Sequence, residues 1–493
     1  MVSKYIEGIK MVAGHNQRLA AKVMKWPAVA VIAAASSLYT MNHARNWWMD
    51  ITDRLGLTVN ALDGSGISEG GTKQPWWKSI LGRVKEEIPA IPVEVMDEVL
   101  RKDEFSKPMN EGIVSGFDTN QYSANSPIED RHIECLFSSS KSFMFGVFDG
   151  HSGYHCSETL RQRMPQYISC AIASDDKAKR KIDKIKSRSY DIIGKEHDDN
   201  PVIELAKNFD RKQKMLQTGS DEFCNFLDKS ENRFSQSELL KLAFSTLDRD
   251  ICKEAVPSGF ADESLLIGLA GSCAIASVIQ GDDLYIANTG DCRAVIGKHS
   301  SSGKWIANQI TQDQTVENIS EVERIEHEHP NEQKTVIRNG RLLGQLQPLR
   351  SFGDVQYKWS KELHEKVINV VYGRPVVSPF SYLTPPYLTA EPVVSHRKIT
   401  DEDRFLIIAT DGLWEKISSE QAVKLVGSHL DNIKKSEQEE NGATLLIKYA
   451  LGKGNDSALA NMMSLPVEYK RHFHDDITVT VVYFNSNFKN SKL

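Results

Sequence analysis

FMFGVFDGH, residues 143–151, is a short run of apolar, strand-forming residues that ends abruptly in Asp149, Gly150 and His151. A run of this length and composition is typical of a buried strand, and this strand therefore carries a carboxylate at its end. Beyond Gly153 the apolar residues follow the spacing of one helix face, at Leu160, Met164, Tyr167 and Ile168. This spacing predicts a helix packed on the same sheet.

The same combination of a strand and aspartates occurs in three further stretches: DLYIANTGD (283–291), RFLIIATDG (404–412) and HDDITVTVVYF (474–484). The first stretch ends at Asp291, and the apolar run of the second ends at Asp411. In the third stretch Asp475 and Asp476 come before the predicted strand. Four predicted strand ends therefore present aspartates.

A single aspartate beside a strand most often forms a turn or caps a helix. Four such strand ends are harder to explain in that way. Carboxylates that are brought together repel one another and raise one another's pKa unless cations neutralise them. Because hard oxygen ligands suit Mg²⁺ or Mn²⁺ rather than zinc, the sequence predicts a site for two magnesium or manganese ions.

The composition is that of a globular protein. The chain has 493 residues, of which 40% are hydrophobic and 26% are charged. These values exclude a wholly disordered chain and fit one large domain with appendages. The net charge of −6 is small for this length. It gives no general attraction to nucleic acid, and we expect no nucleic-acid partner.

The seven cysteines are scattered and include no CxxC pair that would indicate a zinc or redox site. We interpret them as reduced residues that mostly pack in the core. A phosphatase with a nucleophilic cysteine would need a phosphate-cradling loop after that residue. The sequence shows no such loop, which argues against this class of enzyme.

Residues 1–45 form a basic segment in which six Lys and Arg residues accompany a single acid, Glu7. A basic, acid-poor N-terminus is typical of a mitochondrial targeting segment. Within it residues 26–41, WPAVAVIAAASSLYTM, carry no charge. A membrane-spanning helix needs roughly 17 to 25 apolar residues, so the length of this run is at the border. The run is either the apolar middle of a cleaved presequence or an inner-membrane anchor.

Residues 46–110 mix Gly, Pro, paired Trp and charge without a sustained period. They predict a linker with short helices, such as one at 92–100. Residues 111–486 form the predicted main domain, and 487–493 form a tail. Around 174–231 Lys, Asp and Arg dominate, which predicts a solvated helical insertion within the domain.

Six short motifs carry a family resemblance: SPIEDRH (126–132), DGHSG (149–153), TGDCR (289–293), SFGD (351–354), DGLWE (411–415) and DDIT (475–478). In this order and spacing they resemble the metal-dependent protein phosphatases, also called protein phosphatase 2C. Several ordered motifs are far more specific than any one alone. The resemblance covers residues 116–484.

The resemblance implies an α+β fold of four layers, in which two mostly antiparallel sheets pack face to face between two layers of helices. The metal ions would lie at one end of this αββα sandwich. The implied ligands are Asp149 bridging both ions, the carbonyl of Gly150, Asp411 and Asp475 at the other ion, and Glu129 and Asp130 through water. Asp291, Asp411 and Glu415 resemble a weaker third site, in which Glu415 stands where Asp is commoner.

The resemblance also implies a reaction. Two metal ions lower the pKa of a shared water towards about 7, and the resulting hydroxide attacks the phosphorus of a phosphoserine or phosphothreonine. His151, beside the bridging Asp149, resembles the general acid that protonates the departing oxygen. The alternative is a histidine that only hydrogen-bonds a metal ligand.

One position departs from the family pattern. Other members place an Arg four residues before the Glu of the paired acids, where it clamps the substrate phosphate in a bidentate manner. This chain has Asn125 at that substrate-binding position. Arg131 or Arg350 could replace the missing arginine, and the alternative for each is an ordinary ion pair.

Within the family, four stretches resemble most the mitochondrial pyruvate dehydrogenase phosphatases: residues 116–131, 341–360, 384–392 and 475–485. That subgroup implies a matrix enzyme that dephosphorylates the E1 alpha subunit. It also implies docking on a lipoyl domain of the acetyltransferase core with the help of Ca²⁺, and a regulatory subunit, although the sequence contains no EF-hand loop. The alternatives are a phosphatase of another mitochondrial phosphoprotein and a catalytically dead scaffold.

Overall fold

The computed structural model describes residues 92–109, 112–138, 140–173, 190–195, 210–229, 234–256, 263–372, 382–433 and 440–485. The predicted targeting segment 1–45, with its apolar run 26–41, lies outside these residues, as does the tail 487–493. Parts of the linker and of the insertion around 174–231 lie outside them too. Among the described residues, no helix is both long and apolar enough to cross a membrane.

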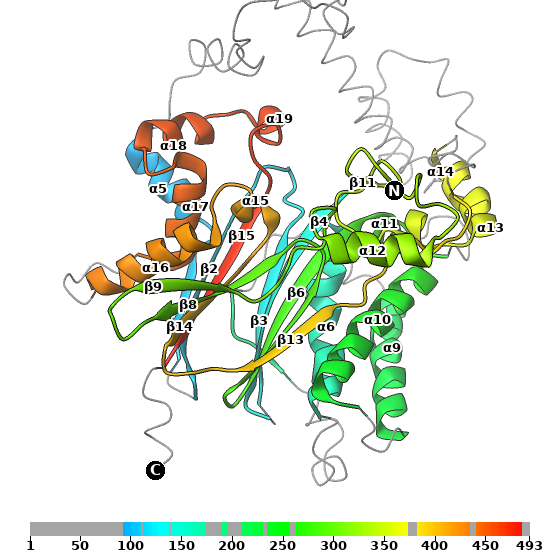
Figure 1. Cartoon of the computed structure of the whole chain (residues 1–493), viewed down its shortest axis with the longest axis horizontal. Coiled ribbons are helices and arrows are strands. Elements are labelled where there is room, and N and C mark those ends of the chain that lie inside the picture. The colour runs from blue at the N-terminus through cyan, green and yellow to red at the C-terminus, as the bar shows by residue number, and fades with distance from the viewer. Residues whose placement is uncertain are drawn as a thin grey trace, which may run out of the picture.

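One central layer is a six-stranded antiparallel sheet (Figure 1). In order across the sheet, its strands are β1 (Phe105–Pro108), β2 (Val114–Tyr122), β15 (Ile477–Phe484), β14 (Asp403–Ala409), β8 (Arg293–His299) and β9 (Trp305–Gln309). The middle strands β15 and β14 are buried along nearly their whole length. Both faces of this sheet are therefore covered, which explains the apolar run Phe405–Ala409 of β14. In β15 the polar residues Thr478 and Thr480 are buried as well.

The other central layer is a seven-stranded antiparallel sheet. Its strands follow the order β13 (Val393–Lys398), β7 (Asp283–Thr289), β6 (Gly271–Gln280), β4 (Ser142–His151), β3 (Arg131–Phe137) and β5 (Asp191–Ile192), and β12 (Phe352–Gly353) pairs with β6. The two sheets pack face to face over a common apolar core. Phe117 of the first sheet and Phe145 of the second meet there edge to face, with ring centroids 5.4 Å apart.

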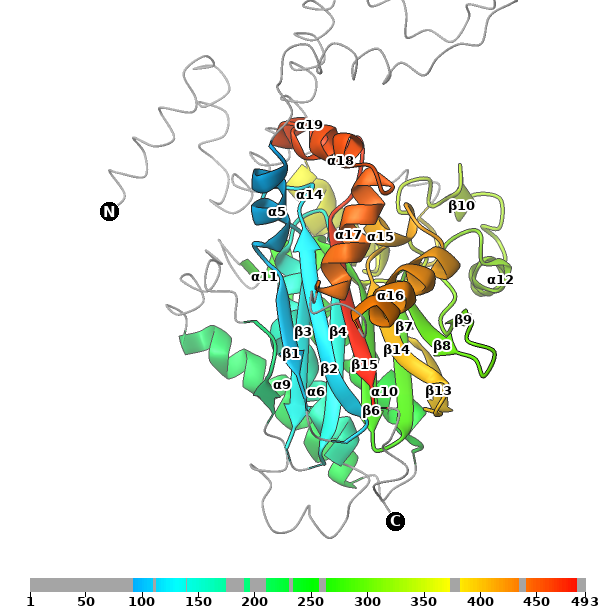
Figure 2. The same cartoon turned by 90° about the vertical axis from the view of Figure 1, so that its left-hand side faces the viewer.

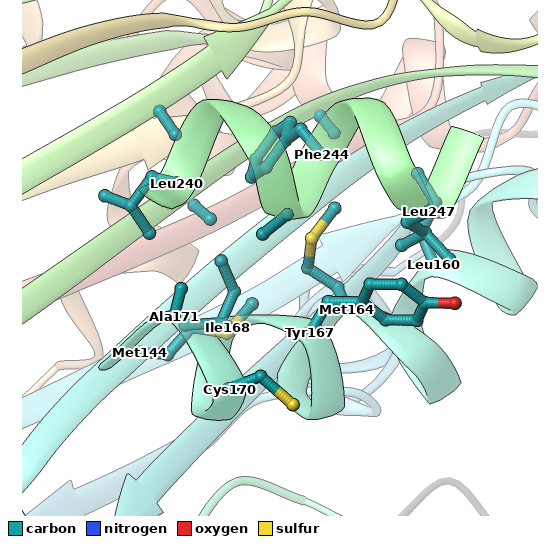
Figure 3. Close-up of a cluster of buried hydrophobic side chains, with 14 of the residues drawn as sticks. Met144, Leu160, Met164, Tyr167, Ile168, Cys170, Ala171, Leu240, Phe244 and Leu247 are labelled. Carbon is teal, nitrogen blue, oxygen red and sulfur yellow. The ribbon is translucent and has the colours of Figure 1, made fainter. Parts of the chain in front are cut away.

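Helices α6 (His155–Ala173) and α10 (Gln236–Glu254) cover the outer face of the seven-stranded sheet, and α9 (Asp210–Lys229) packs against these two helices (Figure 1). The close-up in Figure 3 shows Leu160 and Met164 of α6 in one buried cluster with Phe244 and Leu247 of α10. A capping box between Ser235 and Glu238 fixes the start of α10. The helix predicted after Gly153 is thus confirmed as α6.

Helices α5 (Val93–Arg101), α16 (Ser419–Ile433), α17 (Gly442–Gly452) and α18 (Asp456–Met463) cover the outer face of the six-stranded sheet (Figure 2). Leu446 and Ile447 of α17 pack against Val479 and Val481 of β15. The helix predicted at 92–100 is confirmed as α5. The predicted α+β sandwich of two antiparallel sheets between two helical layers is confirmed as well.

The remaining elements surround the end of the sandwich at which β4 and β14 terminate. They are α11 (Glu263–Leu269), α12 (Ile319–Glu328), β10 (Ile337–Arg338), β11 (Arg341–Leu342), η3 (Val355–Tyr357), α13 (Lys361–Leu363), η4 (His364–Ile368), α14 (Asn369–Tyr372), α15 (Asp411–Trp414) and α19 (Val467–Lys470). A separate apolar cluster that includes Ile325, Leu342 and Tyr387 holds part of this region together. Loops and short helices therefore frame this end of the molecule.

The prediction that all cysteines are reduced is wrong for one pair. Cys170 of α6 and Cys224 of α9 form a disulfide with a Cα–Cα distance of 5.3 Å. The two residues are 54 positions apart, so their spacing in the sequence gave no sign that two packed helices bring them together. The other five cysteines are free, and all of these except Cys252 are buried.

Candidate metal centre and active site

Three aspartates meet at one end of the sandwich. Asp149 comes from β4, Asp291 follows β7, and Asp411 begins α15. Each of them offers a carboxylate oxygen, and these oxygens all lie within 4.8 Å of one another. Strand ends that are far apart in the sequence thus place three hard oxygen donors around one point.

The electrostatics of this cluster favour a bound cation. Burial raises the pKa of Asp149 well above its usual value, and the charge of Asp411 raises it further. Burial likewise raises the pKa of Asp411, with Asp291 as its strongest charged neighbour. Buried carboxylates at this separation repel unless a positive charge lies between them. The all-oxygen donor set fits Mg²⁺ or Mn²⁺.

Asp130 and Asp475 lie beside the three aspartates. Burial raises the pKa of both residues, and both also raise the pKa of Asp149. The hydroxyl of Thr410 donates to Oδ2 of Asp130 at 2.9 Å. Oδ1 of Asp475 accepts the N–H of the next residue at 2.7 Å. Neither residue belongs to the set of oxygens within 4.8 Å.

Glu129 and Gly150 bring the paired acids against the end of β4. Oε1 of Glu129 accepts the N–H of Gly153 at 2.6 Å, and burial raises the pKa of this carboxyl. A Cβ at position 150 would lie 2.2 Å from the carbonyl oxygen of Glu129. Only glycine therefore permits this close approach of the two segments.

The predicted substrate-binding residue Asn125 lies in a loop that Asp476 organises. Oδ1 of Asp476 accepts the backbone N–H groups of Ala124 and Asn125 at 2.6 and 2.8 Å. Oδ2 accepts the N–H of Glu129 at 2.7 Å and the side-chain amide of Asn125 at 3.1 Å. The second aspartate of the DDIT motif thus fixes the loop that precedes the paired acids, a role that the sequence analysis missed.

His151 has a buried acidic partner that the sequence analysis also missed. Nε2 of His151 lies 2.7 Å from Oδ2 of Asp354, and the hydroxyl of Ser351 donates to the same oxygen at 2.6 Å. Burial lowers the pKa of His151, but the charge and the hydrogen bond of Asp354, together with the charges of Asp291 and Glu129, outweigh burial, and the net pKa is raised. A Cβ at Gly271 would lie 2.1 Å from Nε2 of His151. A glycine beneath the pair therefore makes room for it.

Arg131 and Arg350 are both engaged in buried ion pairs. Nε of Arg131 donates to Glu158 at 2.7 Å. Nε and Nη2 of Arg350 donate to the two carboxylate oxygens of Glu321 at 2.8 and 2.5 Å. The alternative role considered for both arginines, an ordinary ion pair, is the one that the structure shows.

The third metal site that the family resemblance implies is only partly assembled. Asp291 and Asp411 belong to the close cluster. Glu415 lies near enough to raise the pKa of Asp411, but it offers no oxygen to the close set, and about half of its side chain is exposed, with Lys416 at 4.0 Å.

Comparisons with known proteins agree on one family. Residues 217–458 match the family model described as protein phosphatase 2C. The chain is 32% identical over 473 residues to the bovine "[Pyruvate dehydrogenase [acetyl-transferring]]-phosphatase 1, mitochondrial", covering 84% of this chain and 87% of that protein. It is 33% identical over 447 residues to the human phosphatase 2 of the same name, covering 80% and 83%.

A crystal structure of a serine-threonine phosphatase 2C from Toxoplasma gondii aligns with a TM-score of 0.43 and 20% identity. The alignment covers 78% of this chain and 99% of that one.

Proposed function

This chain belongs to the protein phosphatase 2C family of metal-dependent serine/threonine phosphatases, and we propose from that premise that it acts on a mitochondrial phosphoprotein. The proposed substrate is phosphoserine on the E1 alpha subunit of pyruvate dehydrogenase, which dephosphorylation would reactivate. The names of the relatives in cattle and humans support this substrate. The basic segment 1–45 supports a mitochondrial matrix location.

The observation that carries the proposal is that the pair of His151 and Asp354 lies at the same end of the sandwich as the cluster of three aspartates. Asp149 and His151 are two residues apart on β4. The first joins the cluster with Asp291 and Asp411, and the second pairs with Asp354. A phosphoester bound at the cluster would therefore have a proton donor within reach.

We assign the metal ligands to Asp149, the carbonyl of Gly150, Asp411 and Asp475, with Glu129 and Asp130 acting through water and Asp291 at a weaker third site. When bound, two Mg²⁺ or Mn²⁺ ions supply an activated water and offset the charge of the phosphoryl group. Oδ2 of Asp354 accepts the hydrogen bond from the Nε2–H group of His151, so the proton that His151 can transfer is the one on Nδ1. His151 gives this proton to the departing serine oxygen.

The remaining partners follow from the same proposal. Docking would use a lipoyl domain of the acetyltransferase core, with Ca²⁺ dependence, and a regulatory subunit would modulate the enzyme. Residues 1–45 would be the targeting segment, in which 26–41 is either the apolar middle of a cleaved presequence or an inner-membrane anchor, and 46–110 would be the linker. Residues 111–486 would be the catalytic domain, with a charged insertion around 174–231 that is either a solvated face or, if the substrate is another mitochondrial phosphoprotein, the docking surface for it.

Phosphate release from phosphorylated pyruvate dehydrogenase complex and from a generic phosphoserine peptide tests the proposal. Each reaction is run with Mg²⁺, Mn²⁺ or EDTA, using the wild type and Asp149→Asn. Metal-dependent release that favours the complex and is abolished by the substitution is the expected result. Release from the peptide alone would discard the substrate and point to another phosphoprotein. No release from either, with metal bound, would point to a scaffold.

A further inference from the structure

The substrate phosphate has no charged ligand at the position where other family members place an arginine. Asn125 stands at the arginine position of other family members, and its amide is bonded to Asp476. The guanidinium groups of Arg131 and Arg350 are each held by a buried glutamate. A phosphate dianion in this site would still need a charged donor.

Arg471 lies directly beyond α19 and four residues before Asp475. Its Nη1 contacts Oδ2 of Asp475, and 52% of its side chain is exposed. Its Nε and Nη2 make no hydrogen bond within the part of the chain that the structure describes. The guanidinium is thus attached to the rim of the carboxylate cluster through one nitrogen only, and it has further donors available.

The backbone brings the segment that carries Arg471 and Asp475 close to the carboxylate cluster. A Cβ at Gly412 would lie 2.0 Å from the carbonyl oxygen of Asp476, so the segment that carries Asp475 is in contact with the segment that carries Asp411.

Two other basic side chains near the site, Lys470 and Arg293, have their own polar and aromatic partners. Lys470 donates to the hydroxyl of Tyr122 at 3.1 Å and lies over its ring. Arg293 pairs with Asp313 at 2.6 Å and lies over the ring of Trp414. Both cations are thus paired with residues outside the close set of carboxylates.

We propose that Arg471 binds the phosphoryl oxygens of the substrate and replaces the arginine that this chain lacks at position 125. The inference rests on the proposed function, because it names a ligand for the phosphate at that site. A planar guanidinium donates two parallel hydrogen bonds to a phosphate, whereas an ammonium acts as a point charge. The ligand class is a phosphate monoester or inorganic phosphate.

The test is calorimetric binding of inorganic phosphate to the Mn²⁺-loaded full chain, together with Mn²⁺ binding to the same proteins. We expect Arg471→Ala to weaken phosphate binding about 10- to 100-fold, as for a lost charged hydrogen-bond donor. Mn²⁺ binding should not weaken, because the substitution removes a positive charge beside Asp475. Arg471→Lys should fall between the wild type and Arg471→Ala, and it also serves as the second variant if Arg471→Ala does not fold.

The matched control is Arg101→Ala, since Arg101 is also a partly exposed arginine paired with an acid one helical turn away. It should bind phosphate as the wild type does. Unchanged phosphate binding in Arg471→Ala would overturn the inference, as would a parallel loss of Mn²⁺ binding or a wild type that does not bind phosphate. If the wild type leaves the pyruvate dehydrogenase complex phosphorylated but Arg471→Ala still loses phosphate affinity, the proposed substrate fails and the inference stands.

Discussion

The ammonium group of Lys358 lies 2.8 Å from each carboxylate oxygen of Asp248. The same ammonium donates to the carbonyl of Ser351 at 2.7 Å, and Asp248 accepts the N–H of Gly353 at 2.9 Å. This buried ion pair therefore holds the 351–354 segment against α10. Asp354 at the end of that segment is the partner of His151. The pair of Lys358 and Asp248 therefore helps to hold Asp354 in position against the proposed proton donor.

Replacing Lys358 by methionine should cost activity on phosphoserine more than activity on p-nitrophenyl phosphate. A small displacement of His151 can slow a proton-assisted step by up to about 100-fold, whereas p-nitrophenolate leaves without a proton. Breaking a buried pair also destabilises the fold by about 3 kcal/mol. Comparison of kcat on both substrates measures the first effect. An equal fall on both would mean that the pair has only a structural role.

His151→Gln should show the same selectivity in a stronger form. Loss of a general acid typically costs about 10²- to 10⁴-fold, and the cost falls on the substrate with the poorer leaving group. Single-turnover rates on a phosphoserine peptide and on p-nitrophenyl phosphate, at saturating Mn²⁺, measure this difference. A variant that binds Mn²⁺ more weakly and slows both reactions alike would instead support a histidine that only positions a metal ligand.

Asp411→Asn should stabilise the metal-free protein. Asp411 repels Asp149 and Asp291 across less than 4.8 Å, and the amide keeps the shape while removing one charge. The wild type should gain stability when Mn²⁺ is added, by an amount that rises with the logarithm of the Mn²⁺ concentration above its Kd, and the variant should gain much less. Thermal unfolding in EDTA and in Mn²⁺ checks both parts. A lower melting temperature of the variant in EDTA would contradict the repulsion argument.

The strands and the aspartates at their ends could be predicted from the sequence because both signals are local. Residues 143–151 contain the apolar run and the carboxylate together, and β4 and Asp149 lie where this stretch predicts them. The strand β15 likewise lies where the stretch after Asp476 predicts it. These features depend only on neighbours in the chain.

The supporting contacts could not be predicted because they join distant segments. Asp354 and His151 are separated by 203 positions, and Asp476 and Asn125 by 351. No periodicity connects such pairs. The SFGD motif is recognisable in the sequence, but nothing in the sequence gives its aspartate a physical role. The pairing of β4 with β6 places Gly271 next to both His151 and Asp354, and this arrangement identifies His151 as the partner of the aspartate.

The buried pair of Glu321 and Arg350 predicts a pH dependence of stability. Burial raises the pKa of Glu321, but the bonds to Arg350 and Arg324 outweigh burial, and the folded-state pKa lies below the usual value of 4.5. A carboxyl whose pKa is lowered by folding contributes stability above its unfolded pKa. That contribution is lost as the pH falls through the folded pKa.

Glu321→Gln should therefore be less stable than the wild type by about 3 kcal/mol near pH 7, because it leaves Arg350 buried without its partner charge. The difference should narrow as the pH falls below about 4.5, since the wild-type carboxyl then becomes protonated as well. Urea unfolding at pH 7, 5 and 4 measures the difference, and the effects of the metal-site aspartates cancel because both proteins contain them. Glu362→Gln, which removes an exposed pair with Lys366, is the control and should change little at any pH. A gap between the wild type and Glu321→Gln that stays constant down to pH 4 would show that the stabilisation comes from packing and hydrogen bonds rather than from the charge of Glu321.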